Sequence, residues 1–407
     1  MNLLKISWSN IRHKQLNTLL STILLAFGIG IISMMLLLKT QLSEKFDRNI
    51  KDIDFVLAAK GSPLQSMLAN VYHVDVPTGN IKVSEARRII KNPMVAEAIP
   101  LAYGDNFEKF RIVGTTEKYP KHYGCSLAEG KLFAAPFEVT IGSSVAQETG
   151  LKLGSTFTSM HGYDNSADNA DAHHHQQLTV VGIFEKSNSV IDNLILTPVE
   201  TTWLVHEHTE DTGINDSTAV DSVHTEPERE MTAYLIKKRN KGAFGMLSKQ
   251  TEDTTMQLAN VAVENSRLMN NFGIGLSAIT AIAVVIMIIS FISIFISLYT
   301  SMRERRYELA LMRTMGGSSG TLFTLIIQEG LLLVLLGYLI GLILSRIGLL
   351  TLSHFMKESF NFGLDNLSVG TQELMLLGLT LLVGLLASVL PARQALKIDI
   401  SKTLSDA

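Results

Sequence analysis

The densest group of potential metal ligands lies between residues 161 and 176, in the stretch HGYDNSADNADAHHHQ. Imidazole and carboxylate groups are the side chains that bind zinc and related divalent ions. The stretch is polar and has no helical or strand periodicity, which favours a low-affinity capture loop over a rigid site. The alternative is a polar insertion that binds no metal. The candidate ligands are His161, Asp164, Asp168, Asp171, His173, His174 and His175.

A metallohydrolase is the least favoured interpretation of these residues. His206-Glu207-His208 and His224 could add ligands, but the first group lacks the spacing of the zinc motif HExxH. We therefore expect no catalytic residue in the chain. The only cysteine, Cys125, excludes an intramolecular disulfide framework, so the fold depends on an ordinary hydrophobic core.

The distribution of charged residues along the chain indicates which parts are membrane-spanning and which are globular. Hydrophobic residues make up 46% of the 407 residues and charged residues only 18%, below the ~25% of a typical soluble protein. The charges concentrate in residues 44–271, which carry 22 basic and 30 acidic side chains, against 13 and 8 elsewhere. This pattern predicts a membrane protein with a globular insert. No basic stripe interleaved with aromatic residues indicates nucleic-acid binding.

Four apolar segments are long enough, or nearly so, for the ~20 residues that a membrane-spanning helix needs. They begin near residues 19, 272, 322 and 374. A cleaved signal peptide is the alternative for the first segment, but its apolar run is too long and no small-residue cleavage site follows it. The fourth is the shortest, and we expect Pro391 to end it. Gly337-x-x-x-Gly341 in the third segment predicts a close approach of helix backbones.

The basic residues that flank these segments predict the orientation. Lysine and arginine accumulate before the first segment, between the second and third, and after the fourth, whereas the loop between the third and fourth has only Lys357. By the positive-inside rule, both termini and the loop near residue 310 are cytoplasmic, and residues 44–271 are extracytoplasmic.

The insert is expected to be an α+β body. The pattern predicts strands at 54–59, 110–114, 138–142, 177–184, 193–198 and 231–236, a helix over 84–91 capped by Ser84, and a helix over 143–150 closed by Gly150. Amphipathic stretches at 41–53 and 247–271 predict two helices continuous with the first two spans. The predicted fold is therefore an α-helical membrane protein with four transmembrane helices and an α+β extracytoplasmic domain inserted between helices 1 and 2.

Several motifs resemble the MacB/FtsX-type family of ABC transporter permeases. The stretch at 110–115 (FRIVGT) is similar to a strand of the family's outer domain, and 138–157 (EVTIGSSVAQETGLKLGSTF) is similar to its "IG…A…G…GD" passage, with Ser155 where an acidic residue is common. The two most specific motifs are RERRYELALMRTMGG at 303–317 and PARQALKIDISKTL at 391–404, with Ile400 in place of proline. The resemblance covers nearly the whole chain.

The resemblance implies a permease subunit that works with a separate cytosolic ABC ATPase. The chain has no P-loop GxxxxGK[ST], and the glycine-rich run at 316–321 lacks its lysine, so ATP and magnesium are expected to bind the partner. The segment after the second span is then a coupling helix that docks on the ATPase, with an apolar stripe of Leu309, Leu311 and Met312; the alternative is a solvated basic flank. The predicted coupling residues are Arg303, Arg305, Arg306, Glu308, Leu309, Leu311, Met312, Arg313, Gly316 and Gly317.

The expected function is coupling of ATP hydrolysis to movement of the outer domain, for export, extrusion or transport of a substrate that the sequence does not identify and that could be metal-linked. The alternative is a mechanotransmitting regulator or adaptor of an extracytoplasmic enzyme. Expected partners, besides the ATPase, are membrane lipid, a second copy or second permease, and an extracytoplasmic protein, in the bacterial inner membrane. Glu329, inside the third span, is expected to face Arg303 or Arg306.

The expected organisation along the chain follows from these assignments. The segments are the cytoplasmic N-terminal segment 1–18, the first span 19–40, the extracytoplasmic MacB-like core domain with stalk helices 41–271, the second span 272–300, the cytoplasmic coupling segment 301–320, the third span 321–350, a short extracytoplasmic loop 351–373, the fourth span 374–390 and the cytoplasmic tail 391–407.

Overall fold

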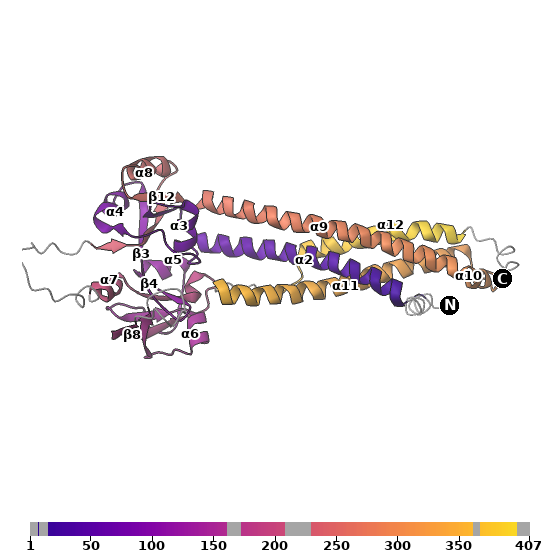
Figure 1. The fold of residues 1–407 in the computed structure, drawn as a ribbon, viewed down its shortest axis with the longest axis horizontal. Helices are drawn as coiled ribbons and strands as arrows, with labels where there is room; N and C mark the ends of the chain where they lie inside the picture. Colours follow the sequence, from indigo (N-terminus) through magenta and orange to yellow (C-terminus); the bar gives the residue numbers. More distant parts are fainter. Residues whose placement is uncertain (1–6, 8–14, 161–171, 208–228, 361–366, 397–407) are drawn as a thin grey trace, which may run out of the picture. The chain divides into compact units, whose positions relative to one another are not determined.

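The computed structural model describes residue 7 and residues 15–160, 172–207, 229–360 and 367–396. By their internal contacts, these residues divide into two units. One consists of described residues within 43–270, called here the α+β unit, and the other, the helical unit, consists of those up to residue 42 and from residue 271 onward. Figure 1 labels the helices and several strands of both.

The α+β unit contains short helices and mostly short strands. Its helices are α3 (Pro63–Asn70), α4 (Val83–Ile90), α5 (Lys118–Tyr123), α6 (Ser143–Thr149), the 3-10 helix η1 (Val190–Asn193), α7 (Val199–Glu207) and α8 (Ala243–Thr251). Its strands are β1 (Phe55–Ala59), β2 (Ile81–Lys82), β3 (Val95–Phe107), β4 (Phe110–Thr115), β5 (Leu127–Gly130), β6 (Glu138–Ile141), β7 (Thr156–Met160), β8 (Ala172–Phe184), β9 (Leu194–Pro198), β10 (Glu230–Met231), β11 (Ala233–Lys238) and β12 (Met256–Asn260).

Among the described residues, ten strands form one mixed sheet in the order β12-β1-β11-β3-β4-β9-β6-β8-β5, with β7 pairing to both β3 and β8. The pairs β4–β9 and β6–β8 are parallel, and the other pairs are antiparallel. Because β7 joins β3 to β8, the strands β3, β4, β9, β6, β8 and β7 close into a ring of hydrogen-bonded neighbours. The long strand β3 also pairs with β11, so it belongs to the ring and to the open part of the sheet.

Alternation along the strands explains why the unit has more than one core. In β4, Ile112 packs in the cluster inside the ring, while its neighbour Val113 packs in the cluster on the other face of the sheet. In β9, Ile195 belongs to the first of these clusters and Leu196 to the second. Successive side chains of a strand point to opposite faces, so a sheet covered on both faces needs apolar residues at both phases. This explains the nearly continuous apolar run LIL at the start of β9.

The structure confirms most of the strands predicted for the insert and corrects two helices. The helix at 143–149 ends at Gly150 with φ +72°, as predicted. The helix predicted at 84–91 begins at Val83, and its N-cap is Lys82, without a side-chain cap bond, so Ser84 is not the cap. The continuous helix predicted over 247–271 is wrong, because β12 interrupts it and pairs with β1. The sequence prediction also lacks β3, β5, β7 and helices α5 and α7.

The helical unit confirms the four-span fold. Its elements are α2 (Gln15–Ile50), α9 (Val261–Glu304), α10 (Arg306–Thr314), α11 (Ser319–Phe360) and α12 (Thr371–Leu396), where α2 and α9 also extend into the α+β unit. In the described part of the chain, four helices are long and apolar enough to cross a membrane: Leu19–Ile50, Val261–Glu304, Ser319–Met356 and Thr371–Gln394. The prediction that Pro391 ends the last span is wrong, since the proline lies inside α12.

Glycines mark the closest contacts between these helices. A Cβ added at Gly341 would lie 2.9 Å from the carbonyl oxygen of Ala26, and one added at Gly337 would lie 2.7 Å from Leu25. Both contacts join α11 to α2, so the close backbone approach predicted from Gly337-x-x-x-Gly341 is confirmed. On the other side of α2, a Cβ at Gly28 would lie 3.2 Å from the backbone nitrogen of Met287 in α9.

Candidate functional site

The segment after the second span forms a separate helix, α10. The expectation that it continues that span as one helix is wrong. Helix α9 ends at Glu304, and Arg305 leaves the helical conformation with φ −99° and ψ 19° before α10 begins. At the other end, the Gly317 amide donates to the Met312 carbonyl at 2.9 Å, and Gly316 has φ +98°. Glycine adopts this left-handed conformation without strain. The two glycines therefore form the turn from α10 into α11.

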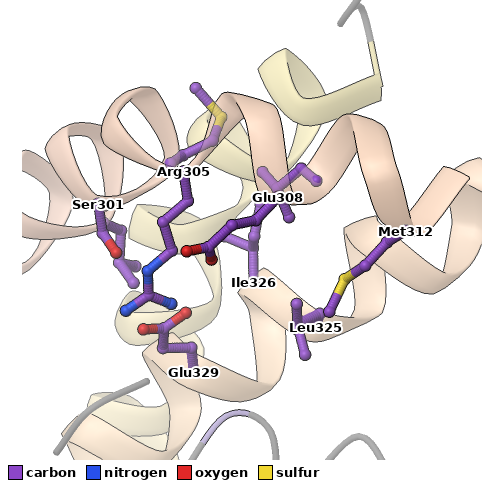
Figure 2. A pocket seen from close by; sticks show the side chains of 10 residues that line it. Ser301, Arg305, Glu308, Met312, Leu325, Ile326 and Glu329 are labelled. Carbon is purple, nitrogen blue, oxygen red and sulfur yellow. The ribbon is translucent and has the colours of Figure 1, made fainter. Parts of the chain in front are cut away.

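The inner face of α10 packs on the spans. Leu309 and Ala310 are buried. Leu309 belongs to an apolar cluster whose other buried members are Met302, Leu322, Leu325, Ile326 and Ala392. Met312 is half-buried and points toward Leu325 (Figure 2). These contacts pack the inner face of α10 against α9, α11 and α12.

The outer face of α10 carries large apolar side chains that nothing in the described residues covers. Tyr307 is 50% exposed, Leu311 45% and Met315 82%. Residues four apart lie on one face of a helix, so these three form a continuous stripe, called here the outer stripe. Arg303 and Arg306 are exposed beside it.

The predicted apolar stripe of Leu309, Leu311 and Met312 is therefore divided between two faces. Leu309 and Met312 pack inward, and only Leu311 belongs to the exposed face. Tyr307 and Met315 were missing from the predicted set, although their four-residue spacing from Leu311 was a signal that could have identified them.

A small, mainly apolar cavity lies where α9, α10 and α11 meet. Its lining includes Ser301, Arg305, Glu308 and Glu329, and Figure 2 shows the Arg305 guanidinium pointing toward the Glu329 carboxylate. Glu329 is buried, and the arginine directed at it is Arg305, whereas the sequence predicted Arg303 or Arg306. The cavity volume is about 40 Å³, which holds only a few water molecules. This cavity is too small to hold a cargo molecule.

A second charged cluster lies within the spans and was not predicted. The Arg346 guanidinium of α11 binds the Glu373 carboxylate of α12 with two bonds of 2.7 Å. The Ser33 hydroxyl of α2 and the Gly370 amide also donate to this carboxylate, and the Tyr338 hydroxyl donates to the Glu373 carbonyl at 2.8 Å. The cluster therefore links three of the four spans. Its sequence signal was the isolated arginine inside the third apolar segment.

The predicted metal ligands fall mostly outside the described residues. His161, Asp164, Asp168 and Asp171 lie there, while His173, His174 and His175 belong to β8, with side-chain positions that are not described. Within the described part of the chain, no group of three or more histidine, cysteine or acidic side chains is arranged to hold a metal ion. The zinc site therefore stays a prediction. Cys125 is a free, partly buried thiol whose pKa is raised by burial, which makes it a weak ligand and nucleophile.

Comparisons with known proteins agree with this architecture. Two family models match, the MacB-like periplasmic core domain over residues 18–233 and the FtsX-like permease C-terminal domain over residues 280–400. A search of the curated proteins finds no significant match.

Solved structures similar to parts of the chain include two outer domains. The periplasmic region of MacB from Actinobacillus actinomycetemcomitans is 12% identical, with 55% of this chain and 95% of that one covered and a TM-score of 0.35. The extracellular domain of the noncanonic ABC-type transporter YknZ from Gram-positive bacteria is 11% identical, with 51% and 99% covered and a TM-score of 0.29. The core-domain model alone spans more than half of the sequence, and the second model covers the remaining spans. The chain belongs to the MacB/FtsX-type family of ABC transporter permeases.

Proposed function

We propose that this permease docks a cytosolic ABC ATPase on the outer stripe of α10 and transmits ATP-driven movement to its α+β unit. The observation that carries the proposal is the exposure of Tyr307, Leu311 and Met315 on a helix whose opposite face is packed. Burying a side chain of this size stabilises an interface by roughly 1.5–3 kcal/mol. Exposed apolar patches of this kind are typical of protein interaction sites.

The charges around α10 support the same partner and the same side of the membrane. Arg303, Arg305, Arg306 and Arg313 lie at the end of the second span and in the segment before the third, which supports a cytoplasmic location for this segment under the positive-inside rule. With four spans, both termini are then cytoplasmic and the α+β unit is extracytoplasmic. For a bacterial chain this corresponds to the inner membrane. Exposed arginines beside an apolar stripe also steer an acidic partner surface toward it.

The contacts of α10 provide a route for the movement. Leu309 and Met312 pack against Leu325 and its neighbours on α11, and Arg305 points toward Glu329 (Figure 2). Since packed interiors deform little, a displacement of α10 moves α11 with it. The break at Arg305 and the turn at Gly316 allow α10 to rotate without unwinding either span.

The chemistry of ATP belongs to the partner in this proposal. The sequence has no P-loop, so ATP and magnesium bind the ATPase and none of the permease side chains is catalytic. The working assembly contains two permease chains, either two copies or this chain with a second permease, as the resemblance to the family implies. The work is done by the α+β unit on an extracytoplasmic cargo or partner protein.

The test uses Leu311→Asp and Tyr307→Asp in the full chain, purified from its native membrane with its bound ATPase. The control is Leu153→Asp in the α+β unit, because Leu153 is 49% exposed, close to the 45% of Leu311. Placing a carboxylate on an apolar contact removes the burial and adds a desolvation cost, so we expect ATPase affinity to fall roughly ten- to hundredfold. The readout is vanadate-sensitive ATP hydrolysis by the purified material.

The expected result is hydrolysis with the wild type and with Leu153→Asp, and little or none with the two α10 variants. Wild-type hydrolysis by all variants would show that α10 is not the docking site. Absence of ATP hydrolysis from the wild-type preparation would contradict the ATPase partner itself. Met312→Asp is a poorer test, because this side chain contributes to the inner packing.

A further inference from the structure

Tyr72 and His73 of the α+β unit link two helix ends to the sheet. Tyr72 contacts the end of α2 and the start of α9, and His73 contacts the sheet. Helix α3 ends at Asn70, and Tyr72 and His73 follow it. His73 has φ +57°, in the left-handed region that few residues other than glycine adopt. This bend directs Tyr72 and His73 toward different partners. We call this pair the junction.

Tyr72 contacts both helix ends that belong to this unit. Its hydroxyl lies 3.2 Å from Oδ1 of Asn265 in the first turns of α9, and it donates a hydrogen bond there because this amide oxygen can only accept. Its ring packs edge-on against Phe46 in the last turns of α2, with centroids 4.6 Å apart. Tyr72 is buried. A displacement of either helix end therefore pushes on the same side chain.

His73 continues the contact into the sheet through a directed chain of hydrogen bonds. Nδ1 lies 2.9 Å from the hydroxyl of Tyr103 in β3, and Nε2 lies 2.6 Å from the hydroxyl of Tyr119 in α5. Tyr103 donates to the carbonyl of Ala69, which can only accept, so its oxygen accepts from Nδ1–H. Nε2 then accepts from Tyr119. This arrangement of donors and acceptors corresponds to a neutral imidazole that carries its proton on Nδ1.

The electrostatic surroundings of the ring agree with this assignment. Burial, followed by the nearby positive charge of Arg111, holds the pKa of His73 well below its ordinary value. The Arg111 guanidinium also lies over the ring of Tyr103, 4.7 Å from its centroid. The imidazole therefore stays neutral at physiological pH, and its two bonds persist.

The end of α2 has a second attachment to the same group of side chains. The Tyr123 hydroxyl of α5 donates to the Asn49 carbonyl at 2.9 Å, and the Asn49 side chain accepts from the Val190 amide at 3.1 Å. The rings of Tyr119 and Tyr123 meet edge to face, 5.5 Å apart. Helix α5 therefore touches both the end of α2 and the histidine.

We propose that Tyr72 and His73 are positioning residues that carry displacement of the two helix ends, residues 43–50 and 261–270, into strand β3. The proposal rests on the function proposed above, because it names the contacts through which movement enters the α+β unit. Both side chains are held on two sides: Tyr72 contacts both helix ends, and both ring nitrogens of His73 form hydrogen bonds. Strand β3 belongs to both parts of the sheet, so a shift of Tyr103 reaches both.

The test is a double-mutant cycle measured by hydrogen exchange in the full chain, without any ATPase. Asn265→Ala perturbs the α9 end by removing the acceptor of Tyr72. His73→Asn breaks the junction, and asparagine tolerates the left-handed backbone at this position. Tyr72→Phe is a gentler second variant that removes only the hydroxyl. The control is Ser266→Ala, the next residue along α9, whose side chain is exposed.

We expect Asn265→Ala to speed amide exchange in β3 by roughly fivefold, which is the effect of losing one ordinary hydrogen bond. In the His73→Asn or Tyr72→Phe background, the same substitution is expected to add no further change in β3, and Ser266→Ala is expected to change nothing there. Independent, additive effects would overturn the junction, since that result describes two local contacts. The experiment needs no nucleotide, so its outcome is separate from the success or failure of the ATPase proposal.

Discussion

The charged cluster within the spans allows a prediction of how much one ion pair contributes to the membrane fold. The Glu373 side chain is 1% exposed and that of Arg346 16%, and their two bonds are parallel at 2.7 Å. Ser33 and the Gly370 amide occupy further acceptor positions of the carboxylate. Both charges are thus held away from solvent with their hydrogen bonds made.

The size of the effect follows from what each substitution leaves behind. Removing one partner of a buried pair leaves an uncompensated charge and costs about 3–5 kcal/mol, whereas replacing both partners by apolar residues is often nearly neutral. We therefore expect Glu373→Gln and Arg346→Met each to lower the free energy of unfolding by about 3–5 kcal/mol. The double variant Arg346→Met with Glu373→Leu is expected to recover most of that loss.

The assay is equilibrium unfolding of the full chain in mixed micelles of mild detergent and dodecyl sulfate. Lys39→Met is the matched control, because it also removes a cation from a spanning helix but its side chain is exposed. We expect this control to change the free energy of unfolding by less than ~0.5 kcal/mol. Single variants that behave like Lys39→Met, with a coupling energy near zero in the cycle, would refute the argument that this pair holds the three spans together.

Three further predictions follow from other contacts. Lowering the pH from 7.5 to 5 should reduce the free energy of unfolding of the α+β unit by up to about 2 kcal/mol through His73. Burial keeps the pKa of His73 low in the fold, so only the unfolded chain takes up the proton below ~pH 6.5. In pH-dependent melting curves, His73→Asn should remove this part of the loss of stability. Gly341→Ala should cost about 1–3 kcal/mol, because its Cβ would press on a carbonyl of α2, whereas Gly378→Ala, with nothing within 4 Å, should be neutral or slightly stabilising in the same micelle assay. Glu329→Leu should leave Arg305 facing an apolar side chain and reduce ATP turnover severalfold while the ATPase still co-purifies; unchanged turnover would show that this contact does not take part in coupling.

Local sequence patterns were sufficient for the spans and for many of the strands. Long apolar runs identify a membrane-spanning helix because every backbone group must be satisfied inside the segment, and this requirement does not depend on the rest of the chain. The same holds for the helix ending at Gly150, because its left-handed cap depends only on the glycine at that position. These features are determined within about 20 residues of sequence.

Features that depend on distant pairing were not predictable in this way. The stretch from Met256 to Asn260 reads as part of a helix, but it pairs with β1, about two hundred residues earlier in the chain. Likewise, Arg346 inside the third apolar segment and Glu373 just before the fourth appeared as two separate charges, and only the packing of α11 on α12 brings them together. A sequence read one segment at a time contains no signal for either contact.

Helix α10 shows a third limit of prediction from the sequence, namely which face of an amphipathic helix is buried. Its composition indicated an amphipathic segment, yet Leu309 and Leu311 are two positions apart and so lie on nearly opposite faces of a helix. Deciding which face is buried requires the neighbouring helices, which cover Leu309 and leave Leu311 exposed. For this reason the set of predicted coupling residues mixed inward-facing and outward-facing side chains.

The connectivity of the chain explains why both α10 and the junction matter for one function. The described chain passes between its two units near Leu42–Ser43 and near Asn270, and each crossing lies within an unbroken helix, α2 or α9. From Gly30 to its end α2 contains no glycine or proline, whereas α9 has Gly273 and Gly275 beside its crossing, with nothing packed against either. Since glycine weakens a helix by about 1 kcal/mol relative to alanine, α9 bends more easily than α2 at this point. Under the proposed function, a displacement that starts at α10, which follows α9 directly, would reach the α+β unit as a change of α9 relative to a stiffer α2. Tyr72 contacts both of these helices, so the proposed junction lies where such a change would act on the sheet.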